Sequence, residues 1–210
     1  MFPSILHPAF SARFLQEPPP APLDPRELPE RGDHQFSPDL AIDFPVEAIK
    51  AAAVLVPIIA RPVPTVLFTR RSSRLKNHSG QVAFPGGRID ETDKGALAAA
   101  LRETEEEIGL DRAFVEPIGY LDLYQSTTGY RITPVVGIVT PPLNLVLNRD
   151  EVEETFEVPL DFLMERKNHT IERREWKGRE RAYVAITFER HYIWGVTAGI
   201  LQNLREKVLT

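Results

Sequence analysis

Residues 97–108 form the segment that most constrains how this chain can fold. On a helix, at about 100° per residue, four of its side chains fall on one stripe, which is the expected core face. That stripe contains Leu97, Leu101, Thr104 and Ile108. Asp93 is a candidate N-cap and Gly109 a candidate C′ residue, so the helix is expected over about residues 94–108. A helix with one apolar face has to pack against another layer of the protein.

Short apolar runs rich in β-branched residues surround this helix and are typical of strands. We expect strands at residues 51–60, 65–69, 81–84, 114–123, 132–140, 154–158, 171–176 and 182–188. The first two and the last two of these form hairpin-like pairs, the latter around Lys177-Gly178. A helical turn is expected at 160–166, and helical spacing recurs at 193–208. This alternation predicts an α/β (α+β) fold with a mixed sheet and helices on its faces.

The first 45 residues differ in composition from the rest of the chain. Prolines that oppose both helix and central strand recur at positions 18, 19, 20, 22, 25 and 29. We therefore predict a proline-rich N-terminal arm at residues 1–45, with a short helix around residues 5–15. A single domain is expected over residues 46–210.

Charge and composition exclude several classes of protein. The formal net charge is −5, so no overall basic field attracts nucleic acid, and no nucleic-acid partner is expected. The chain contains no cysteine, which excludes thiolate nucleophiles, disulfides and cysteine-ligated zinc. No run approaches the roughly 20 apolar residues needed to span a bilayer, and no secretory signal is recognisable. We expect a cytoplasmic protein without a membrane partner.

Three glutamates lie opposite the apolar stripe of the helix. Glu103, Glu106 and Glu107 stand at i, i+3 and i+4 and therefore share one turn. Like charges at this spacing repel one another, so the face is either well solvated or prepared for a cation. Hard divalent cations such as Mg²⁺ prefer a few carboxylates together with substrate phosphate. Arg102 stands four residues before Glu106 and is positioned to hold a carboxylate.

Residues 86–110, with the Gly86-Gly87 turn and the three glutamates, resemble the signature motif of the Nudix hydrolase superfamily. The run from Arg102 to Leu110 matches the second half of that motif at every fixed position. The first half departs from it, because Lys94 stands where the pattern usually has Glu. The nearest acids there are Asp90 and Asp93. The resemblance implies a Nudix-type α/β/α sandwich with a catalytic loop–helix–loop.

Two further segments are similar to the coenzyme A pyrophosphatase branch of this superfamily. They are residues 67–87, which end in QVAFPGG, and residues 193–201, IWGVTAGIL. The branch hydrolyses the pyrophosphate of coenzyme A or its thioesters to 3′,5′-ADP and (acyl-)4′-phosphopantetheine. Two alternatives stay open: a Nudix hydrolase of another nucleoside diphosphate derivative, such as ADP-ribose or a nucleotide sugar, and a catalytically silent nucleotide-binding Nudix module. A homodimer also stays open.

The resemblance implies roles for individual residues. Glu103, Glu106 and Glu107, with the backbone carbonyl of Gly87, are expected to bind Mg²⁺ or Mn²⁺. Arg102 is expected to orient these carboxylates.

A further acid for metal binding or general-base catalysis is expected from residues 150–154, with Glu154 as the first candidate and Glu151 as the second. A charged surface loop is an equally good interpretation of that run.

A basic segment precedes the Gly86-Gly87 turn in a chain that is otherwise acidic. Its members are Arg70, Arg71, Arg74, Lys76 and His78. Arginine forks suit phosphate oxygens, and coenzyme A carries a 3′-phosphate in addition to its pyrophosphate. We expect at least two of these residues to bind the small-molecule substrate, although a solvated loop explains any one of them alone.

Overall fold

The computed structural model describes residues 4–38, 46–176 and 178–209. Within these residues nine strands form one mixed sheet, whose main path runs β1-β7-β8-β2-β3-β4. Three more strands pair off this path: β5 with β2, β6 with β8 and β9 with β3. The strands are β1 (Arg31–Gly32), β2 (Lys50–Ile59), β3 (Thr65–Arg71), β4 (Val82–Ala83), β5 (Gly86–Arg88), β6 (Val115–Tyr120), β7 (Tyr124–Gln125), β8 (Tyr130–Val139) and β9 (Val152–Pro159).

Strand β2 lies in the interior of the sheet and is apolar on both faces. It pairs in parallel with β8 and antiparallel with β3, so the expected first hairpin is confirmed. Successive side chains of a strand point to opposite faces. Ala53, Leu55 and Ile59 accordingly pack on one side of the sheet, and Val56 and Ile58 pack on the other. A continuous apolar run is what a strand covered on both faces requires.

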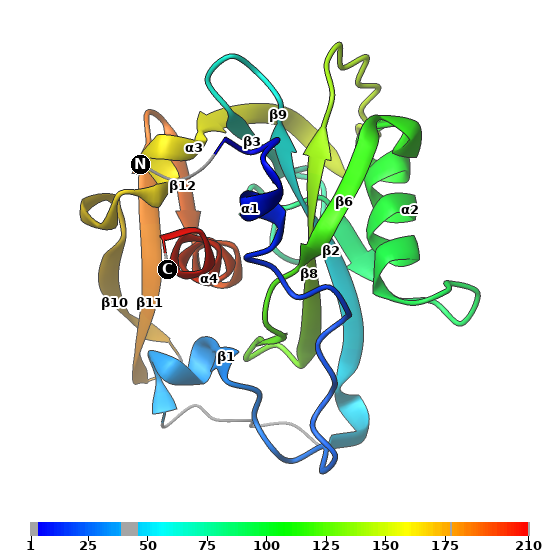
Figure 1. Ribbon diagram of the computed structural model, residues 1–210. Helices are drawn as coiled ribbons and strands as arrows, with labels where there is room; N and C mark the ends of the chain where they lie inside the picture. Colours follow the sequence, from blue (N-terminus) through cyan, green and yellow to red (C-terminus); the bar gives the residue numbers. More distant parts are fainter. Residues whose placement is uncertain (1–3, 39–45, 177, 210) are drawn as a thin grey trace.

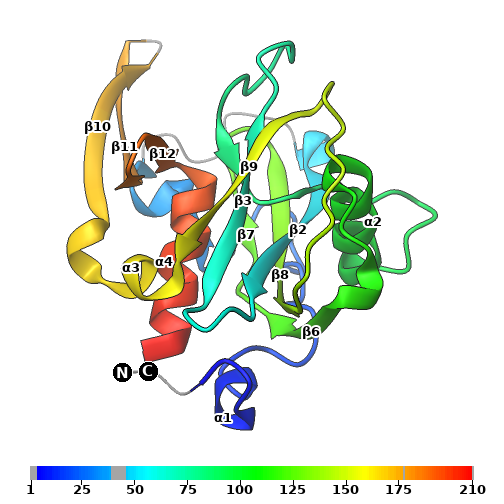
Figure 2. The ribbon, with the colours of Figure 1, turned by 90° about the horizontal axis from the view of Figure 1, so that it is seen from above.

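Each face of the large sheet is covered by a helix, as the two views of the ribbon show (Figure 1, Figure 2). Helix α2 (Ala96–Ile108) packs on one face. Helix α4 (Val196–Leu209) packs on the other, together with α3 (Leu160–Met164) and a second sheet. That sheet contains β10 (Thr170–Trp176), β11 (Arg179–Phe188) and β12 (His191–Trp194). The predicted α/β/α sandwich with a mixed sheet is confirmed.

Most expected elements are present, with corrections at two helix starts. Helix α2 begins at Ala96 with Gly95 as its N-cap, and not near Lys94 with Asp93 as its cap. Its C-cap is Gly109 in the left-handed conformation, with φ of 67°, as predicted. The last helix begins at Val196, because residues 191–194 pair with β11 as a strand. The antiparallel pairing of β10 with β11 confirms the late hairpin, although Lys177 lies outside the described residues.

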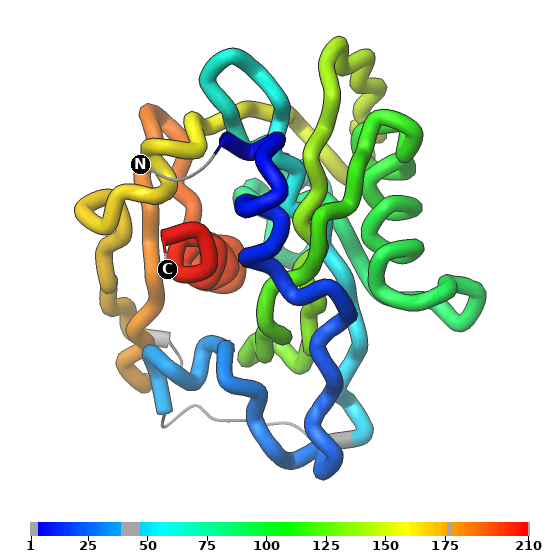
Figure 3. The backbone as a smooth tube through the Cα atoms, in the orientation of Figure 1, coloured from blue at the N-terminus to red at the C-terminus, as the bar shows by residue number. Residues whose placement is uncertain are grey.

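The described part of the N-terminal segment packs along the domain (Figure 3). The short helix expected there is α1 (Pro8–Ser11). Phe10 and Phe14 are buried, and the backbone of Leu15 exchanges two hydrogen bonds with that of Tyr120. Further along, β1 pairs in parallel with β7. The predicted division between residues 45 and 46 adjoins residues 39–45, which lie outside the described part, and it stays a prediction.

Membrane-spanning helices are not found in the described parts of the chain, where every helix is too short or too polar to cross a bilayer.

Candidate active site

Helix α2 delivers its acidic side to the edge strand β5. The predicted turn at Gly86-Gly87 is wrong, because both residues lie on β5, which pairs antiparallel with β2. The Glu103 carboxylate lies directly over Gly87, where any β-carbon would collide with it. At Gly86, φ is 148°, and a β-carbon there would collide with the backbone of β2. Position 86 therefore requires glycine for its backbone, whereas a β-carbon at position 87 would force the flexible end of Glu103 to move.

Glu107 is the most enclosed of the three glutamates, with 4% of its side chain exposed. Its Oε2 accepts a hydrogen bond of 3.1 Å from the backbone N–H of Gly86, and its Oε1 lies 3.7 Å from Arg71 Nη1. Burial raises the pKa of Glu107 to about 7, and the nearby Glu151 and Glu103 raise it further against the opposing effects of Gly86 and Arg71. A nearby cation would favour the ionised form of this buried carboxyl group.

Glu103 is half-buried and belongs to the same group of charges. Burial raises its pKa, Arg102 acts in the opposite direction, and the charges of Glu106 and Glu151 raise it again. Glu103, Glu106, Glu107 and Glu151 therefore share a region in which their negative charges oppose one another. The structure brings all three predicted metal-binding glutamates to this region, with Glu103 against Gly87, Glu107 bound to Gly86 and Glu106 bound to Arg102.

Arg102 holds two of these glutamates. Its Nη1 donates to Glu103 Oε1 and to Glu106 Oε2, at 3.0 Å in each case. Its Nε and Nη2 bind the two carboxylate oxygens of Asp93 at 3.0 and 2.8 Å, and this pair lowers the pKa of Asp93 to about 2. The predicted orienting role of Arg102 agrees with these contacts, whereas the part played by Asp93 was not expected from the sequence.

The donor atoms of this site suit a hard divalent cation. In the part of the chain that the structure describes, no three His, Asp or Glu side chains are arranged to hold a metal ion as they stand. The carboxylates are instead bound by Arg102, Arg71 and the Gly86 amide. They are nevertheless all oxygen donors, their charges repel one another, and the missing side chain at Gly87 lets the Glu103 carboxylate lie directly against β5. Glu103, Glu106, Glu107 and the Gly87 carbonyl are the groups that could bind Mg²⁺ or Mn²⁺ once these carboxylates turn toward it.

The basic segment divides between the two faces of the large sheet. Arg70 and Arg71 are consecutive on β3, so their side chains point in opposite directions. Arg71 points toward α2 and Glu107. Arg70 binds Glu154 on the other face, with 2.8 Å between Nε and Oε1, and lies 3.3 Å from Glu153. The structure therefore places one of these two arginines, and not both, beside the acidic helix.

The other members of the basic segment lie in the exposed loop after β3. Arg74 is 3.3 Å from Asp150, in a pair that is exposed on both sides. Nδ1 of His78 is hydrogen-bonded to Gln81 Oε1 at 2.9 Å. Lys76 is exposed, and within the described residues it has no hydrogen bond or ion pair. These side chains are available to a ligand without breaking strong internal contacts.

Glu154 and Glu151, the two candidates for the further acid, occupy different environments. Glu154 lies between Arg70 and Arg190, with His191 Nδ1 3.7 Å away. Burial opposes its ionisation, but the two arginines outweigh burial and lower its pKa. Glu151 instead accepts a hydrogen bond from Asn148 Nδ2 at 3.1 Å, and its negative charge raises the pKa of Glu107 on the acidic helix. The geometry thus associates Glu151, rather than the first-ranked Glu154, with the glutamates of α2.

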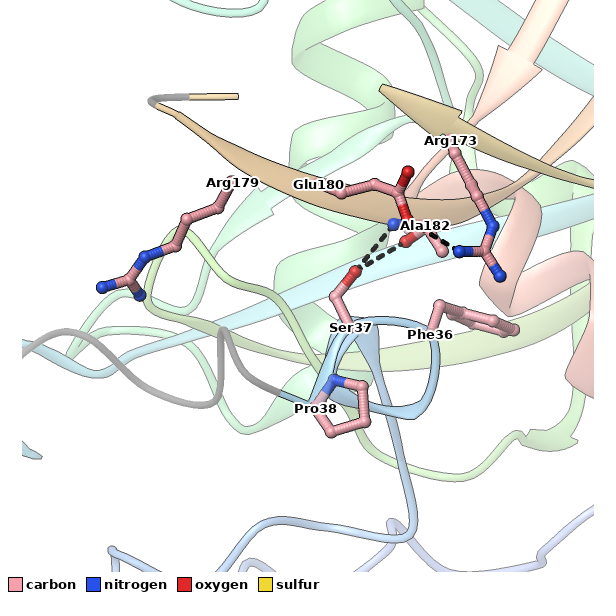
Figure 4. A pocket seen from close by; sticks show the side chains of 7 residues that line it. All are labelled: Phe36, Ser37, Pro38, Arg173, Arg179, Glu180 and Ala182. Atoms are coloured by element: carbon pink, nitrogen blue, oxygen red, sulfur yellow. Dashed lines mark hydrogen bonds and ion pairs between the residues drawn. The ribbon is translucent and has the colours of Figure 1, made fainter. Parts of the chain in front are cut away.

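A surface pocket of about 710 Å³ lies away from this site, between the N-terminal segment and the hairpin of β10 and β11. Figure 4 shows the Ser37 hydroxyl directed at the backbone of Ala182, and Arg173 directed at Glu180. The pocket is separated from α2 by the large sheet (Figure 1). None of its lining residues was a predicted site residue.

Comparison with known proteins identifies the family of this chain. A family model described as NUDIX domain matches residues 49–180, which is more than half of the chain. The chain therefore belongs to the Nudix family. "Uncharacterized Nudix hydrolase NudL" of Escherichia coli K12 is 46% identical over 156 residues, which cover 74% of this chain and 81% of that protein.

Two solved structures are also similar to part of this chain. A Caenorhabditis elegans Ap4A hydrolase in a binary complex is 20% identical, with a TM-score of 0.45, and covers 54% of this chain and 82% of its own. The Nudix domain of Shewanella oneidensis NrtR, solved with ADP-ribose, is 18% identical, with a TM-score of 0.43, and covers 57% of this chain and 80% of its own.

Proposed function

We propose that this Nudix protein hydrolyses the pyrophosphate bond of coenzyme A or its thioesters, with Mg²⁺ or Mn²⁺, to 3′,5′-ADP and (acyl-)4′-phosphopantetheine. One observation carries the proposal. Arg71, from the segment that resembles the coenzyme A branch, lies 3.7 Å from Glu107 of the acidic helix. A side chain suited to phosphate therefore lies beside the candidate metal ligands. Family membership supports the broader activity, hydrolysis of a nucleoside diphosphate derivative.

The chemistry of a phosphoanhydride explains why such a site is needed. Its oxygens carry dense negative charge and repel an attacking hydroxide, so charge neutralisation and positioning are the main catalytic contributions. A divalent cation, when bound, supplies this neutralisation and lowers the pKa of a water molecule. The glutamates of α2 would supply the carboxylate oxygens that bind this cation, and the Arg71 guanidinium would bind a phosphate oxygen.

Glu151 is our candidate for the group that accepts a proton from the attacking water. It lies on the segment that enters β9, and its carboxylate is held by Asn148 at 3.1 Å. The backbone of Asn148 is bound to the carbonyl oxygen of Glu107 at 2.9 Å, which fixes this segment to the end of α2. A carboxylate positioned in this way can act as a general base or as a further metal ligand.

The exposed loop after β3 supports a substrate with an additional phosphate. Arg74, Lys76 and His78 lie on this loop, whose start is fixed by Arg71 beside the acidic helix. Arginine and lysine side chains of this kind bind phosphate oxygens strongly. We assign to them the 3′-phosphate of coenzyme A. Arg70 is our weaker candidate, because it is already bound to Glu154.

A substrate panel tests this proposal. The purified protein is incubated with coenzyme A, an acyl thioester, ADP-ribose or a nucleotide sugar in Mg²⁺ or Mn²⁺, with an EDTA control, and the products are separated by chromatography. Release of 3′,5′-ADP only with metal supports the proposal. Preference for ADP-ribose would contradict the coenzyme A assignment but keep the hydrolase. Folded protein that cleaves no member of the panel would favour a catalytically silent binding module.

A further inference from the structure

The segment 193–201 connects the small sheet of β10, β11 and β12 to helix α4, and the proposed function leaves this segment without a role. Ile193 is fully buried on β12, and the N–H of Gly195 donates to the carbonyl oxygen of Val184 at 3.0 Å. Further along α4, Leu201 is fully buried in the core. These contacts hold the start of α4 in place, so a buried side chain in its first turn has a fixed position.

Thr197, in the first turn of α4, forms a hydrogen bond to the large sheet. It is buried, and its Oγ1 donates to the carbonyl oxygen of Val82 on β4 at 3.2 Å. Strand β4 has two residues, and within the described residues it pairs with β3 alone. From the β3 side, Thr69 Oγ1 donates to the carbonyl oxygen of Ala83 at 3.2 Å. A strand this short makes few backbone hydrogen bonds, so the bond from Thr197 is a large share of what fixes it.

Strand β4 joins the exposed loop after β3 to the edge strand β5. That loop ends at Gln81, whose carbonyl oxygen accepts a hydrogen bond from the N–H of Arg71 at 2.9 Å. Beyond β4 the chain reaches Gly86, whose N–H is bound to Glu107 of the acidic helix. A movement of β4 therefore changes where the exposed loop lies relative to the glutamates of α2.

We infer that Thr197 is a positioning residue which, through the Val82 carbonyl, fixes the exposed loop after β3 at the distance from α2 that substrate binding requires. The inference rests on the proposed function, because it takes this loop as the part that binds the substrate's phosphates. A buried carbonyl that loses its donor is left unsatisfied, so β4 would shift or loosen without the Thr197 hydroxyl. Helices α4 and α2 lie on opposite faces of the sheet, so Thr197 acts on binding and not on the reacting atoms. Its loss should therefore raise KM and leave kcat nearly unchanged.

The test separates the hydroxyl of Thr197 from its bulk. Thr197→Val keeps the shape and removes the donor, whereas Thr197→Ser keeps the donor. Thr170→Val is the matched control, because Thr170 Oγ1 also donates to a backbone carbonyl at 3.2 Å, that of Ala185 in the small sheet. Three quantities are measured: the dissociation constant of coenzyme A by calorimetry in EDTA, kcat and KM in Mn²⁺, and amide hydrogen exchange of residues 72–83 by mass spectrometry.

We expect Thr197→Val to raise the dissociation constant and KM about fivefold, to change kcat less than about twofold, and to speed exchange of residues 72–83. Thr197→Ser should return all three close to wild type, and Thr170→Val should change none of them. If Thr197→Val does not fold, Thr197→Cys, whose thiol is a weak donor, should show a smaller rise in the same quantities.

Equal effects of Thr197→Val and Thr170→Val would overturn the inference, as would a fall in kcat at unchanged KM or a Thr197→Ser variant that behaves like Thr197→Val. Wild-type protein that binds coenzyme A without cleaving it contradicts only the proposed reaction. Wild-type protein that does not bind coenzyme A contradicts the proposed substrate. In both cases exchange of residues 72–83 still decides the role of Thr197, because that measurement needs no substrate.

Discussion

The Glu107 carboxylate accepts a hydrogen bond from the backbone N–H of Gly86, 3.1 Å away, at a point where Glu107 is almost completely buried. This contact joins the last turn of α2 to the edge strand β5, and it holds an acid where water cannot solvate its charge well. The consequences can be measured without knowing the substrate.

The stability of metal-free protein should depend on the ionisation of Glu107. Its pKa is raised from 4.5 to about 7, so the folded state holds this proton more tightly than the unfolded state does. The contribution is therefore fully present below about pH 4.5 and is lost as the pH rises to about 7. At about 1.4 kcal/mol per pKa unit the loss amounts to about 3 kcal/mol. Denaturant unfolding in EDTA, from pH 5 to 8, measures it.

Glu107→Gln is the control for that experiment, because an amide resembles the protonated acid and cannot ionise. The difference in unfolding free energy between wild type and Glu107→Gln should grow as the pH rises. Parallel pH profiles for the two proteins would show that Glu107 does not titrate in this range. Added Mn²⁺ should stabilise the wild type more at pH 8 than at pH 5, because metal binding requires the ionised carboxylate.

The two acids at the start of β9 should differ in their effect on turnover. Glu151→Gln is expected to lower kcat by about 100-fold, because Glu151 lies with the glutamates of α2 and a general base contributes at least this much. Glu154→Gln removes an equal charge three residues further along the chain but disturbs the pairs with Arg70 and Arg190, and kcat should fall less than about threefold. Steady-state kinetics of the two variants measures this difference. A larger fall in kcat for Glu154→Gln than for Glu151→Gln would instead favour Glu154 as the general base.

Gly87→Ala should remove metal binding while the domain stays folded. Its β-carbon would collide with the Glu103 carboxylate, so Glu103 has to move away from β5. We expect Mn²⁺ affinity to fall at least about tenfold and the unfolding free energy to fall by about 1–3 kcal/mol. Gly178→Ala is the control, because a β-carbon there meets nothing within 4 Å and only the φ of 75° is unfavourable. Unchanged Mn²⁺ affinity in Gly87→Ala would contradict the placement of the site.

The N-terminal segment should contribute to stability without acting in catalysis. Asp33 accepts hydrogen bonds from the Tyr124 hydroxyl at 2.9 Å and from the backbone and side chain of Thr127 at 2.8 and 3.0 Å. Asp33→Ala leaves these donors unpaired and should cost about 2–3 kcal/mol. Asp24→Ala, in the exposed part of the same segment, should cost less than about 1 kcal/mol. Chemical denaturation compares them, and equal losses would contradict this account of the segment.

Sequence patterns predicted the fold where local periodicity and burial agree. The apolar run of β2 is an example. The core stripe of α2 was only partly predicted, because Leu97 and Leu101 are half-buried whereas Ala99, Ala100 and Glu107 are buried.

The start of α4 was misplaced because Ile193 fits both a helical and a strand pattern, and only pairing with β11 decides between them. The prediction that Asp93 caps the helix was wrong because its carboxylate is hydrogen-bonded to Arg102. That bond depends on how the loop folds onto the helix, and sequence spacing does not reveal it.

The acidic residues of the candidate site could be predicted from the sequence, but the positions of its basic residues were harder to predict. Glu103, Glu106 and Glu107 share one turn of a helix, so their proximity follows from the sequence. The separation of Arg70 from Arg71 depends on which face of β3 each one takes, and the pairing with β9 is irregular at that point. Alternation along the strand was the available signal, since neighbours on a strand cannot both reach one site.

The central claim is that glutamates of the acidic helix α2 act in the hydrolysis of a phosphoanhydride. The most direct test compares substitutions at two neighbouring residues of that helix. Glu106 faces Arg102 and the proposed metal site, whereas Glu105 is paired with Arg112 on the exposed side. Mn²⁺-dependent release of 3′,5′-ADP from coenzyme A should fall at least about 100-fold in Glu106→Gln and less than about twofold in Glu105→Gln, with both proteins folded. Near-normal release by Glu106→Gln would contradict the account.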